Sequence, residues 1–435
     1  MELIKKIQTR DAKIGVIGLG YVGLPLAIEF VQAGFKVLGI DIDKNKIELI
    51  NNGENYIKDI DDDILKNAIE DNSLKATDDF SLVKDMDSIS ICVPTPLNKQ
   101  KDPDISFIVA VMDKIKEYLH KDMALILEST TYPGSTKELI LPYINDHGFK
   151  IGGDFFLCFS PERIDPGNKH FKTSNTPKVI GGITNNCTKT GVSLYQCIVN
   201  KVVDVSSTET AEMVKLLENT FRAINIGLAN EIAIMCEKLG VNVWEVIDAA
   251  ATKPFGYMKF SPGPGLGGHC IPIDPHYLSW KLKTLDYEAR FIQLAGEINT
   301  NMPNHVLNLI STHLNNMEKS LNGSKILIIG VAYKKDINDT RESPALDIIQ
   351  LLITSGTVID YYDTYVPNLQ FSNISIESLT SLEEKNLNTY DACVIVTDHS
   401  NIDYETIYNH CELIIDTRNV FYDKNGDHIK RLGQG

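Results

Sequence analysis

The sequence lacks the features that mark membrane proteins, zinc proteins and disulfide-rich secreted proteins. It contains no run of about 18 apolar residues, so we expect no membrane-spanning helix. None of its eight cysteines forms a CxxC pair and its ten histidines show no zinc-ligand spacing, which predicts free thiols and no metal. The first residues, MELIKKIQTRDAK, lack the apolar core of a signal peptide. We therefore expect a mature chain that begins here and stays in the cytoplasm.

Clustered positive charge is also missing. The chain has 42 Lys and Arg residues against 58 Asp and Glu residues, a net charge of −16, and the basic residues are scattered. Nucleic-acid binding depends on clustered Lys and Arg, so this function is excluded. An anionic ligand would need cations placed locally around it.

The 435 residues are enough for two or three domains. Residues 13–40 read as strand, glycine turn, helix and strand, and later apolar runs continue a mostly parallel sheet to about residue 205. A long helix follows from Ser207 to about Leu239, and a second αβ pattern opens at Ser324 with KILIIGVAY. The predicted fold is α/β, with two Rossmann-like doubly wound parallel-sheet domains (1–205 and 313–435) joined by a helical central domain (206–312).

A glycine-rich turn, GLGYVG, follows the first predicted strand and opens a helix. In this context Gly18 permits the tight turn, Gly20 lets the backbone approach a pyrophosphate, and Gly23 lets the helix lie close to the strand. Asp41 ends the second strand, where its carboxylate accepts hydrogen bonds from a ribose and repels a 2′-phosphate. The pattern therefore favours NAD over NADP, with flavin or S-adenosylmethionine binding as the alternatives.

The segment SPGPGLGGHCIPIDP, residues 261–275, is the most unusual in the chain. Its glycines and prolines predict a loop shaped around a ligand, and Cys270 is the only cysteine in such a loop. Cys92, Cys158 and Cys393 lie in apolar strands, where an inert buried thiol is the better interpretation. Taken alone, Cys270 is a candidate nucleophile that matches no general protease pattern.

Seven motifs taken in order resemble the UDP-glucose/UDP-mannuronate dehydrogenase family: GLGYVG, VPTP, EST, SPER, AEMVKLLENTFRA, GPGLGGHCIPIDP and VAYKKDINDTRESP. The resemblance runs from about residue 13 to Arg418. Within the family, GGHC and PERIDPGN resemble the branch that acts on UDP-N-acetylhexosamines, and IPIDPHYLSWK most resembles the UDP-N-acetylglucosamine 6-dehydrogenases. UDP-N-acetylmannosamine dehydrogenases are the alternative, and a UDP-glucose 6-dehydrogenase is a more distant one.

The resemblance implies an NAD-dependent, four-electron oxidation of the C6 alcohol to the acid, through a thiohemiacetal and a thioester on Cys270. Lys215 and Asn219, one helical turn apart, match the residues that stabilise the oxyanion or move a proton. Asp274, Thr130 and Glu162 match the groups that position or activate the hydrolytic water. Each also has a plain structural interpretation, since Lys215 could be a solvated helix charge and Glu162 a loop cap.

The resemblance also implies the binding residues. The positions that match NAD contacts are Gly18, Gly20, Tyr21, Val22, Gly23, Asp41, Thr95, Thr130 and Arg341. The positions that match UDP-sugar contacts are Arg163, Ile164, Lys215, Asn219, Arg222, Gly267, Tyr333, Lys334 and Arg418. His269 either contacts the N-acetyl group or packs beside the loop, and the role of Lys253 is open. The family implies a homodimer or a higher homo-oligomer.

Two other functions fit parts of the sequence. A two-electron β-hydroxyacid dehydrogenase also joins a Rossmann domain to a helical one through a catalytic lysine, but it needs neither Cys270 nor a second αβ domain. A non-catalytic sugar-nucleotide sensor would keep the fold for binding alone.

Overall fold

The computed structural model describes residues 2–57, 60–98, 102–164, 170–268, 271–383 and 387–435. The chain forms two compact units, one of residues 1–218 with 276–287 and the other of residues 219–275 with 288–435. The first crossing between them falls inside the long helix α8 (Thr208–Leu239).

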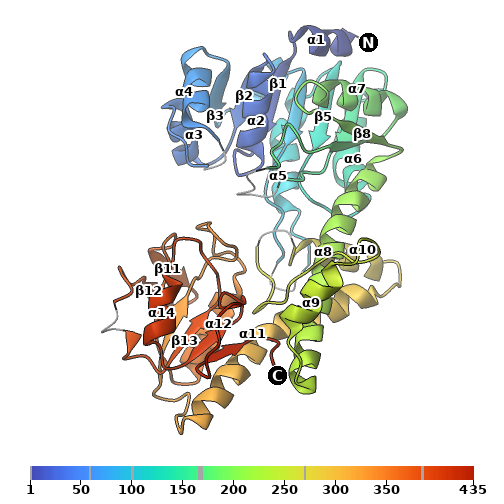
Figure 1. Ribbon diagram of the computed structural model, residues 1–435. Helices are drawn as coiled ribbons and strands as arrows, with labels where there is room; N and C mark the ends of the chain where they lie inside the picture. The colour runs from blue at the N-terminus through green and yellow to red at the C-terminus, as the bar shows by residue number, and fades with distance from the viewer. Residues whose placement is uncertain (1, 58–59, 99–101, 165–169, 269–270, 384–386) are drawn as a thin grey trace. The chain divides into compact units, whose positions relative to one another are not determined.

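The first unit is built on an eight-stranded sheet in the described part of the chain, with strand order β3-β2-β1-β4-β5-β6-β7-β8 (Figure 1). Its strands are β1 (Lys13–Ile17), β2 (Lys36–Ile40), β3 (Leu74–Thr77), β4 (Ser88–Ile91), β5 (Met123–Leu127), β6 (Phe155–Phe159), β7 (Lys178–Gly182) and β8 (Val202–Val205). Its helical segments before α8 are α1 (Glu2–Thr9), α2 (Gly23–Gln32), α3 (Lys44–Asn51), α4 (Asp62–Glu70), η1 (Phe80–Asp85), α5 (Ser106–Ile115), η2 (Lys116–Tyr118), η3 (Thr136–Ile140), α6 (Leu141–Asp146) and α7 (Asn185–Tyr195).

Both faces of this sheet are covered because successive strand residues point to opposite sides. On β5, Ala124 and Ile126 belong to the core shared with α2, α4 and α7. Leu125 and Leu127 belong to the core shared with α5 and α6. The strand order reverses between β1 and β4, and in such sheets ligands bind beyond the carboxyl ends of the strands at this point.

Two strands run against the first six. β7 pairs antiparallel with β6, with Cys158 opposite Gly182 and Phe159 opposite Gly181, and β8 pairs parallel with β7. The amino end of β7 therefore lies at the carboxyl end of β6. This reversal brings Lys178, the first residue of β7, to the edge of the sheet at which β1–β6 end.

The second unit holds a five-stranded parallel sheet in its described residues, with order β10-β9-β13-β14-β15. Its elements after α8 are α9 (Val243–Ala251), α11 (Arg290–Asn316), β9 (Lys325–Ile329), α12 (Pro344–Thr354), β10 (Val358–Tyr362), the hairpin β11 (Asn368–Phe371) and β12 (Ile374–Glu377), β13 (Ala392–Ile395), α14 (Tyr404–His410), β14 (Ile414–Asp416) and β15 (Ile429–Arg431). Helix α10 (Asp274–Lys283) begins in this unit and continues in the first. Leu327 of β9 packs in the core with α14, and Ile328 packs in the core with α11 and α12.

The predicted α/β fold with two Rossmann-like sheets and a long central helix is confirmed. The predicted boundaries at residues 205 and 312 stay predictions. No helix in the described ranges is both long and apolar enough to cross a membrane.

Candidate active site

The glycine turn after β1 has the geometry that its spacing predicts. Gly18 has a φ of +93°, and a Cβ there would lie 2.5 Å from the carbonyl oxygen of Cys92. A Cβ on Gly23, the first residue of α2, would lie 1.8 Å from the carbonyl oxygen of Gly18. By contrast, no described atom lies within 4 Å of a Cβ built on Gly20. Two glycines are thus required by packing, and the third leaves open space beside the backbone.

Asp41, which directly follows β2, binds the backbone of this turn. Asp41 is buried, and its carboxylate accepts hydrogen bonds from the N–H groups of Leu19 at 2.7 Å and Asp43 at 3.0 Å. Tyr21 is about half exposed, at 49%. Val22 is the N-cap of α2. In the first turn of α2, the N–H groups of Leu24 and Leu26 donate to the carbonyls of Gly20 and Val22, at 3.1 and 3.2 Å, and Pro25 has no N–H. An anion would therefore be bound by the glycine turn and the start of the helix rather than by the whole first turn.

The loop after β5 is attached to α8 by a buried carboxylate. Glu212 of α8 accepts hydrogen bonds from the Gly134 N–H at 2.6 Å, the Ser135 hydroxyl at 2.9 Å, and the Thr136 N–H and hydroxyl at 2.9 and 2.6 Å. Thr130 lies in this loop and is half-buried. Glu212 thus fixes the Thr130 loop to the helix that carries Lys215.

Thr95 is buried beyond the end of β4. Its backbone carbonyl accepts a hydrogen bond from the Tyr277 hydroxyl at 2.9 Å. Tyr277 belongs to the part of α10 that lies in the first unit, so this bond joins α10 to the VPTP loop.

Glu162 and Lys215 lie together in the first unit. The Lys215 ammonium donates to the backbone carbonyl of Glu162 at 2.7 Å, and both side chains are buried. The Glu162 carboxylate accepts from the N–H groups of Arg163 and Ile164, at 2.6 and 2.7 Å, and from the Lys178 ammonium at 3.0 Å. Burial raises the pKa of Glu162, but Lys178 and these hydrogen bonds outweigh it, so the pKa is lowered and the group is a carboxylate.

Arg163 is tied to α8 by an ion pair. Its guanidinium lies 2.5 Å from the Glu218 carboxylate and donates to the carbonyl of Pro177 at 2.6 Å. The N–H of the next residue, Ile164, is occupied by Glu162. The PER segment is therefore held by α8 and by the residue that precedes β7.

The second unit brings together Asn219 and Asp274. The Asn219 side-chain amide donates to the Asp274 carboxylate, and both residues are buried. Asn219 lies on α8 and Asp274 begins α10. This pairing of two predicted catalytic residues, 55 positions apart in sequence, was not derivable from spacing.

The glycine-rich loop is built into the second unit by buried amides. The Gly263 N–H donates to the Asn230 side-chain oxygen at 2.9 Å. Asn230 in turn donates to Asn299 of α11 at 2.9 Å, and Asn299 donates to the carbonyl of Ala223 at 3.1 Å. These contacts fix the loop between α8 and α11.

The same loop packs against three of the predicted binding residues. A Cβ on Gly263 would lie 2.7 Å from the Arg418 guanidinium, and one on Gly267 would lie 2.8 Å from the Tyr333 Cβ. The Gly268 N–H donates to the carbonyl of Arg341 at 3.2 Å. Glycine is needed here because the loop backbone lies directly on these residues.

The other predicted residues lie as follows. Lys334 follows Tyr333 in the second unit, and the Arg341 guanidinium donates a hydrogen bond to the Asp339 carboxylate. Arg222 and Lys253 are exposed. His269 and Cys270 lie outside the described residues, so the predicted nucleophile has no described geometry.

Models of one family match three parts of the chain. They are the NAD binding domain at residues 12–199, the central domain at 209–301 and the UDP binding domain at 327–423 of the UDP-glucose/GDP-mannose dehydrogenase family. The chain belongs to this family. It is an NAD-dependent oxidoreductase, and its glycine turn and Asp41 lie within the NAD binding domain.

Curated relatives extend over almost the whole chain. A UDP-N-acetyl-D-mannosamine dehydrogenase from Pyrococcus horikoshii is 35% identical over 97% of this chain and 99% of its own. One from Campylobacter jejuni is 38% identical over 78% and 82%. A UDP-N-acetyl-D-glucosamine 6-dehydrogenase from Pseudomonas aeruginosa is 33% identical over 90% and 91%. A solved structure of UDP-D-ManNAc dehydrogenase from Pyrococcus horikoshii has a TM-score of 0.88 at 34% identity, covering 97% and 99%.

Sequence reasoning missed several residues that hold this family member's site together. They are Glu128, Lys178, Tyr195, Glu212, Asn230 and Asn299. Only Lys178 carried a usable signal, because it stands at the start of an otherwise apolar strand, KVIGG.

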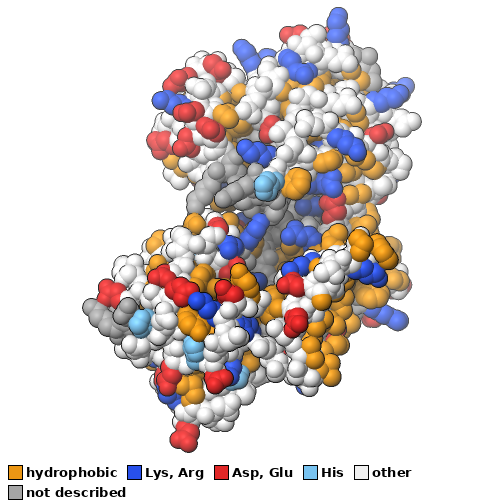
Figure 2. Space-filling model, in the orientation of Figure 1, with side chains coloured by type: hydrophobic (Ala, Val, Ile, Leu, Met, Phe, Trp, Pro, Cys, Tyr) orange, Lys and Arg blue, Asp and Glu red, His pale blue; other side chains and the backbone are white. Residues whose placement is uncertain are grey.

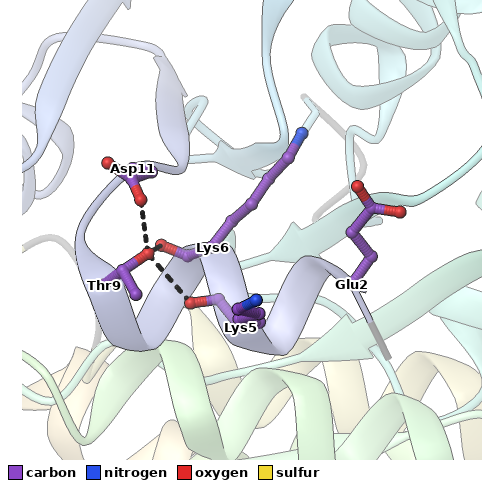
Figure 3. A pocket seen from close by; sticks show the side chains of 5 residues that line it. All are labelled: Glu2, Lys5, Lys6, Thr9 and Asp11. Atoms are coloured by element: carbon purple, nitrogen blue, oxygen red, sulfur yellow. Dashed lines mark hydrogen bonds between the residues drawn. The ribbon is translucent and has the colours of Figure 1, made fainter.

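A hollow of about 530 Å³ lies beside α1, lined by Glu2, Lys5, Lys6, Thr9 and Asp11 (Figure 3). Helix α1 precedes β1, so this hollow is at the amino edge of the sheet, whereas the glycine turn after β1 is at the carboxyl edge. None of the predicted site residues lines it.

Substitution can distinguish the packing role of Gly23 from the proposed binding role of Gly20 in the turn after β1. Gly20→Ala should leave the melting temperature unchanged and weaken NAD binding, roughly tenfold or more, because a methyl group would occupy the open space. Gly23→Ala should lower the melting temperature, because its Cβ collides with the Gly18 carbonyl. Thermal unfolding and NAD titration check both. Unchanged NAD affinity in Gly20→Ala would contradict the assignment.

Proposed function

We propose that the chain oxidises the C6 alcohol of a UDP-N-acetylhexosamine to the carboxylate, with UDP-N-acetylmannosamine as the preferred substrate. The observation that carries this proposal is the packing of the loop that leads to Cys270 directly on Tyr333 and near the Arg418 guanidinium. A loop that leads to Cys270 and packs on these two residues, within the second unit, suits the oxidation of a sugar whose nucleotide they are proposed to bind.

The choice of sugar departs from the interpretation that the IPIDPHYLSWK motif favoured. The relatives named for UDP-N-acetylmannosamine reach 35% and 38% identity, against 33% for the one named for UDP-N-acetylglucosamine. The two sugars differ only in the direction of one substituent, and a short motif is a poor guide to such a difference. The comparisons therefore support the alternative better than the first prediction.

The proposed chemistry has two oxidations and one hydrolysis. The C6 alcohol is oxidised to an aldehyde, and the Cys270 thiolate adds to it to give a thiohemiacetal. The second oxidation gives a thioester, and water then cleaves the carbon–sulfur bond to release the acid and the thiol. Bound NAD supplies the acceptor for the hydride lost in each oxidation, so one turnover consumes two NAD and one water.

Charge stabilisation is assigned to the buried residues of α8. Lys215 uses one of its three N–H donors on the Glu162 carbonyl, which fixes its ammonium in place. A fixed cation stabilises the oxyanion of the thiohemiacetal and of the hydrolytic intermediate. Asn219 is a second donor for this role, and its bond to Asp274 orients the amide.

Water activation is assigned to Asp274, with Thr130 and Glu162 as positioning groups. The Glu162 carboxylate already accepts three hydrogen bonds and its pKa is lowered, so it is a weak base. Asp274 is the better candidate to accept the proton of the water. Arg163, Ile164, Arg222, Gly267, Lys334 and Arg418 stay the proposed UDP-sugar contacts, and Arg341 stays a proposed NAD contact.

The substrate is tested by NADH release from five sugar nucleotides: UDP-N-acetylmannosamine, UDP-N-acetylglucosamine, UDP-N-acetylgalactosamine, UDP-glucose and UDP-galactose. We expect the highest kcat/KM with UDP-N-acetylmannosamine, two NADH per sugar, and a product mass of the uronic acid. One NADH per sugar would favour the β-hydroxyacid type of reaction. Preference for UDP-glucose would exclude the hexosamine branch, and binding without NADH release would indicate a sensor.

We also propose that the chain forms a homodimer through the second unit. Helices α8 and α11 pack closely at Gly227, where a Cβ would lie 3.1 Å from the Ala295 Cβ. Large apolar side chains on these two helices are nevertheless exposed: Leu228 at 53%, Met235 at 44%, Leu239 at 74%, Phe291 at 75% and Leu294 at 53%. Figure 2 shows hydrophobic side chains gathered over the α8–α9 region. Exposed apolar surface of this kind is typical of an interface.

Cytoplasmic location stays a prediction.

Sedimentation velocity tests the dimer. The wild-type chain should sediment as a dimer at micromolar concentration, and Leu228→Glu with Leu294→Glu should sediment as a monomer, because the new carboxylates would be buried without partners. Tyr422→Glu, at a side chain 76% exposed and outside these helices, is the control and should stay dimeric. A monomeric wild-type chain would contradict the proposal.

A further inference from the structure

Three charged side chains are buried together at the carboxyl edge of the first sheet. The Lys178 ammonium lies 2.5 Å from the Glu128 carboxylate and 3.0 Å from the Glu162 carboxylate. The relative exposure of these residues is 4% for Lys178, 1% for Glu128 and 8% for Glu162. Isolated buried charges are strongly disfavoured, so each of these groups depends on the others.

The strand topology explains how the three groups meet. Glu128 directly follows β5, and Glu162 lies three residues beyond the end of β6. β7 is antiparallel to β6 with Phe159 opposite Gly181, and continuing this register places residue 178 opposite residue 162. A parallel β7 would have placed Lys178 at the other edge of the sheet.

The charges in this cluster do not balance, since one ammonium faces two carboxylates. Burial raises the pKa of Glu128, whereas for Glu162 the Lys178 ammonium and backbone hydrogen bonds outweigh burial and lower the pKa. Burial disfavours the charged ammonium of Lys178, but the two carboxylates outweigh it and raise its pKa. The cation thus allows two carboxylates to lie close together in the interior.

Further groups in the described part of the chain face the Glu162 segment. The Glu128 carboxylate also accepts a hydrogen bond from the Tyr195 hydroxyl, and Cys92 is a buried neutral thiol nearby. The charged groups among the described residues that contact the segment also include Lys215, Arg163 and Glu218, which belong to the contacts described above.

Glu162 links Lys178 to Lys215, because its side chain contacts one lysine and its backbone carbonyl contacts the other. Lys178 holds the side chain of Glu162, and the backbone carbonyl of the same residue accepts from the Lys215 ammonium at 2.7 Å. Displacement of the Glu162 carboxylate would release the N–H groups of Arg163 and Ile164 and thereby the turn that carries this carbonyl.

We infer that Lys178 is a positioning residue of the dehydrogenase, which keeps Glu162 fixed as a carboxylate between Glu128 and the PER turn and thereby aims the ammonium of Lys215. This inference rests on the proposed role of Lys215 in the reaction. It adds a residue that contacts neither substrate nor NAD in the proposed mechanism.

The pH dependence of Lys178→Met tests the inference. Without the cation, the burial of Glu162 is no longer offset by an opposite charge, so the pKa of Glu162 should rise and its carboxylate should be lost on the acid side at a higher pH than in the wild type. We expect kcat to fall roughly tenfold or more at pH 7, its acid limb to move up by about one unit or more, and activity to recover toward pH 9. Lys178→Arg should restore part of the activity.

Two further variants separate this effect from unfolding. Lys178→Met combined with Glu128→Gln removes the second carboxylate but leaves Glu162 buried without its cation, so the acid limb should stay above that of the wild type and no higher than that of the single variant. Lys137→Met is the matched control, because Lys137 also forms an ion pair, 2.5 Å from Glu209, but is half exposed. Its pH profile should equal that of the wild type. If Lys178→Met does not fold, the double variant carries the test, since its acid limb should still lie above that of the wild type.

The inference is overturned if folded Lys178→Met keeps the wild-type pH profile, or if its activity falls equally at every pH. It is also overturned if the double variant folds and has the acid limb of the wild type. If the wild-type chain oxidises none of the UDP-sugars, the proposed function fails instead. In that case, carbon-13 NMR of labelled Glu carboxyls, assigned with Glu162→Gln, still decides whether Lys178 sets the titration of Glu162.

Discussion

A buried ammonium must be paired with an opposite charge, and the carboxyl edge of the first sheet is organised around the buried ammonium of Lys178. Because β7 is antiparallel to β6, this side chain lies between Glu128 and Glu162. Glu162 then fixes its own turn by accepting two backbone N–H groups, and its carbonyl fixes Lys215. A single strand reversal thus connects the end of β5, the end of β6 and the helix α8.

The two parallel sheets use their corresponding carboxylates differently. Asp41 follows β2 and accepts two backbone N–H groups beside an open glycine turn. Asp363 follows β10 in the same topological position, but it accepts the N–H groups of four residues and also contacts the buried His399 ring nitrogen at 3.0 Å. The hydrogen bonds of the Asp363 carboxylate are therefore made within its own domain. This difference fits the proposal that Tyr333 and Arg418, rather than an acidic residue at a strand end, bind the ligand of the second sheet.

The sequence predicted the parts of the molecule that are set by local rules. Gly18 and Gly23 are required by a positive φ and by contacts with nearby backbone, so their spacing was sufficient to predict the turn. The antiparallel direction of β7 was not predictable, because direction depends on pairing between distant segments. For the same reason the place of Lys178 at the start of an apolar strand marked the residue as unusual but could not predict that two carboxylates would bury it.

In the candidate site, too, local sequence identified residues, whereas contacts between distant segments could not be predicted. The residue types at Lys215, Asn219 and Asp274 were identified by resemblance, whereas their partners were revealed only by the fold: Glu162 for the lysine, and each other for the asparagine and aspartate. The amide chain from Gly263 through Asn230 to Asn299 also joins positions far apart in sequence. Local motifs thus supplied the proposed roles of these residues, and long-range pairing determined their contacts.

The central claim is that oxidation proceeds through an acyl group bound to Cys270. The most direct test is intact-protein mass spectrometry of acid-quenched wild-type enzyme during turnover, followed by peptide mapping. The account predicts a mass increase equal to the UDP-uronoyl group on the peptide that contains Cys270, absent in Cys270→Ser. Full turnover with no adduct in the wild type, or undiminished turnover in Cys270→Ser, would contradict it.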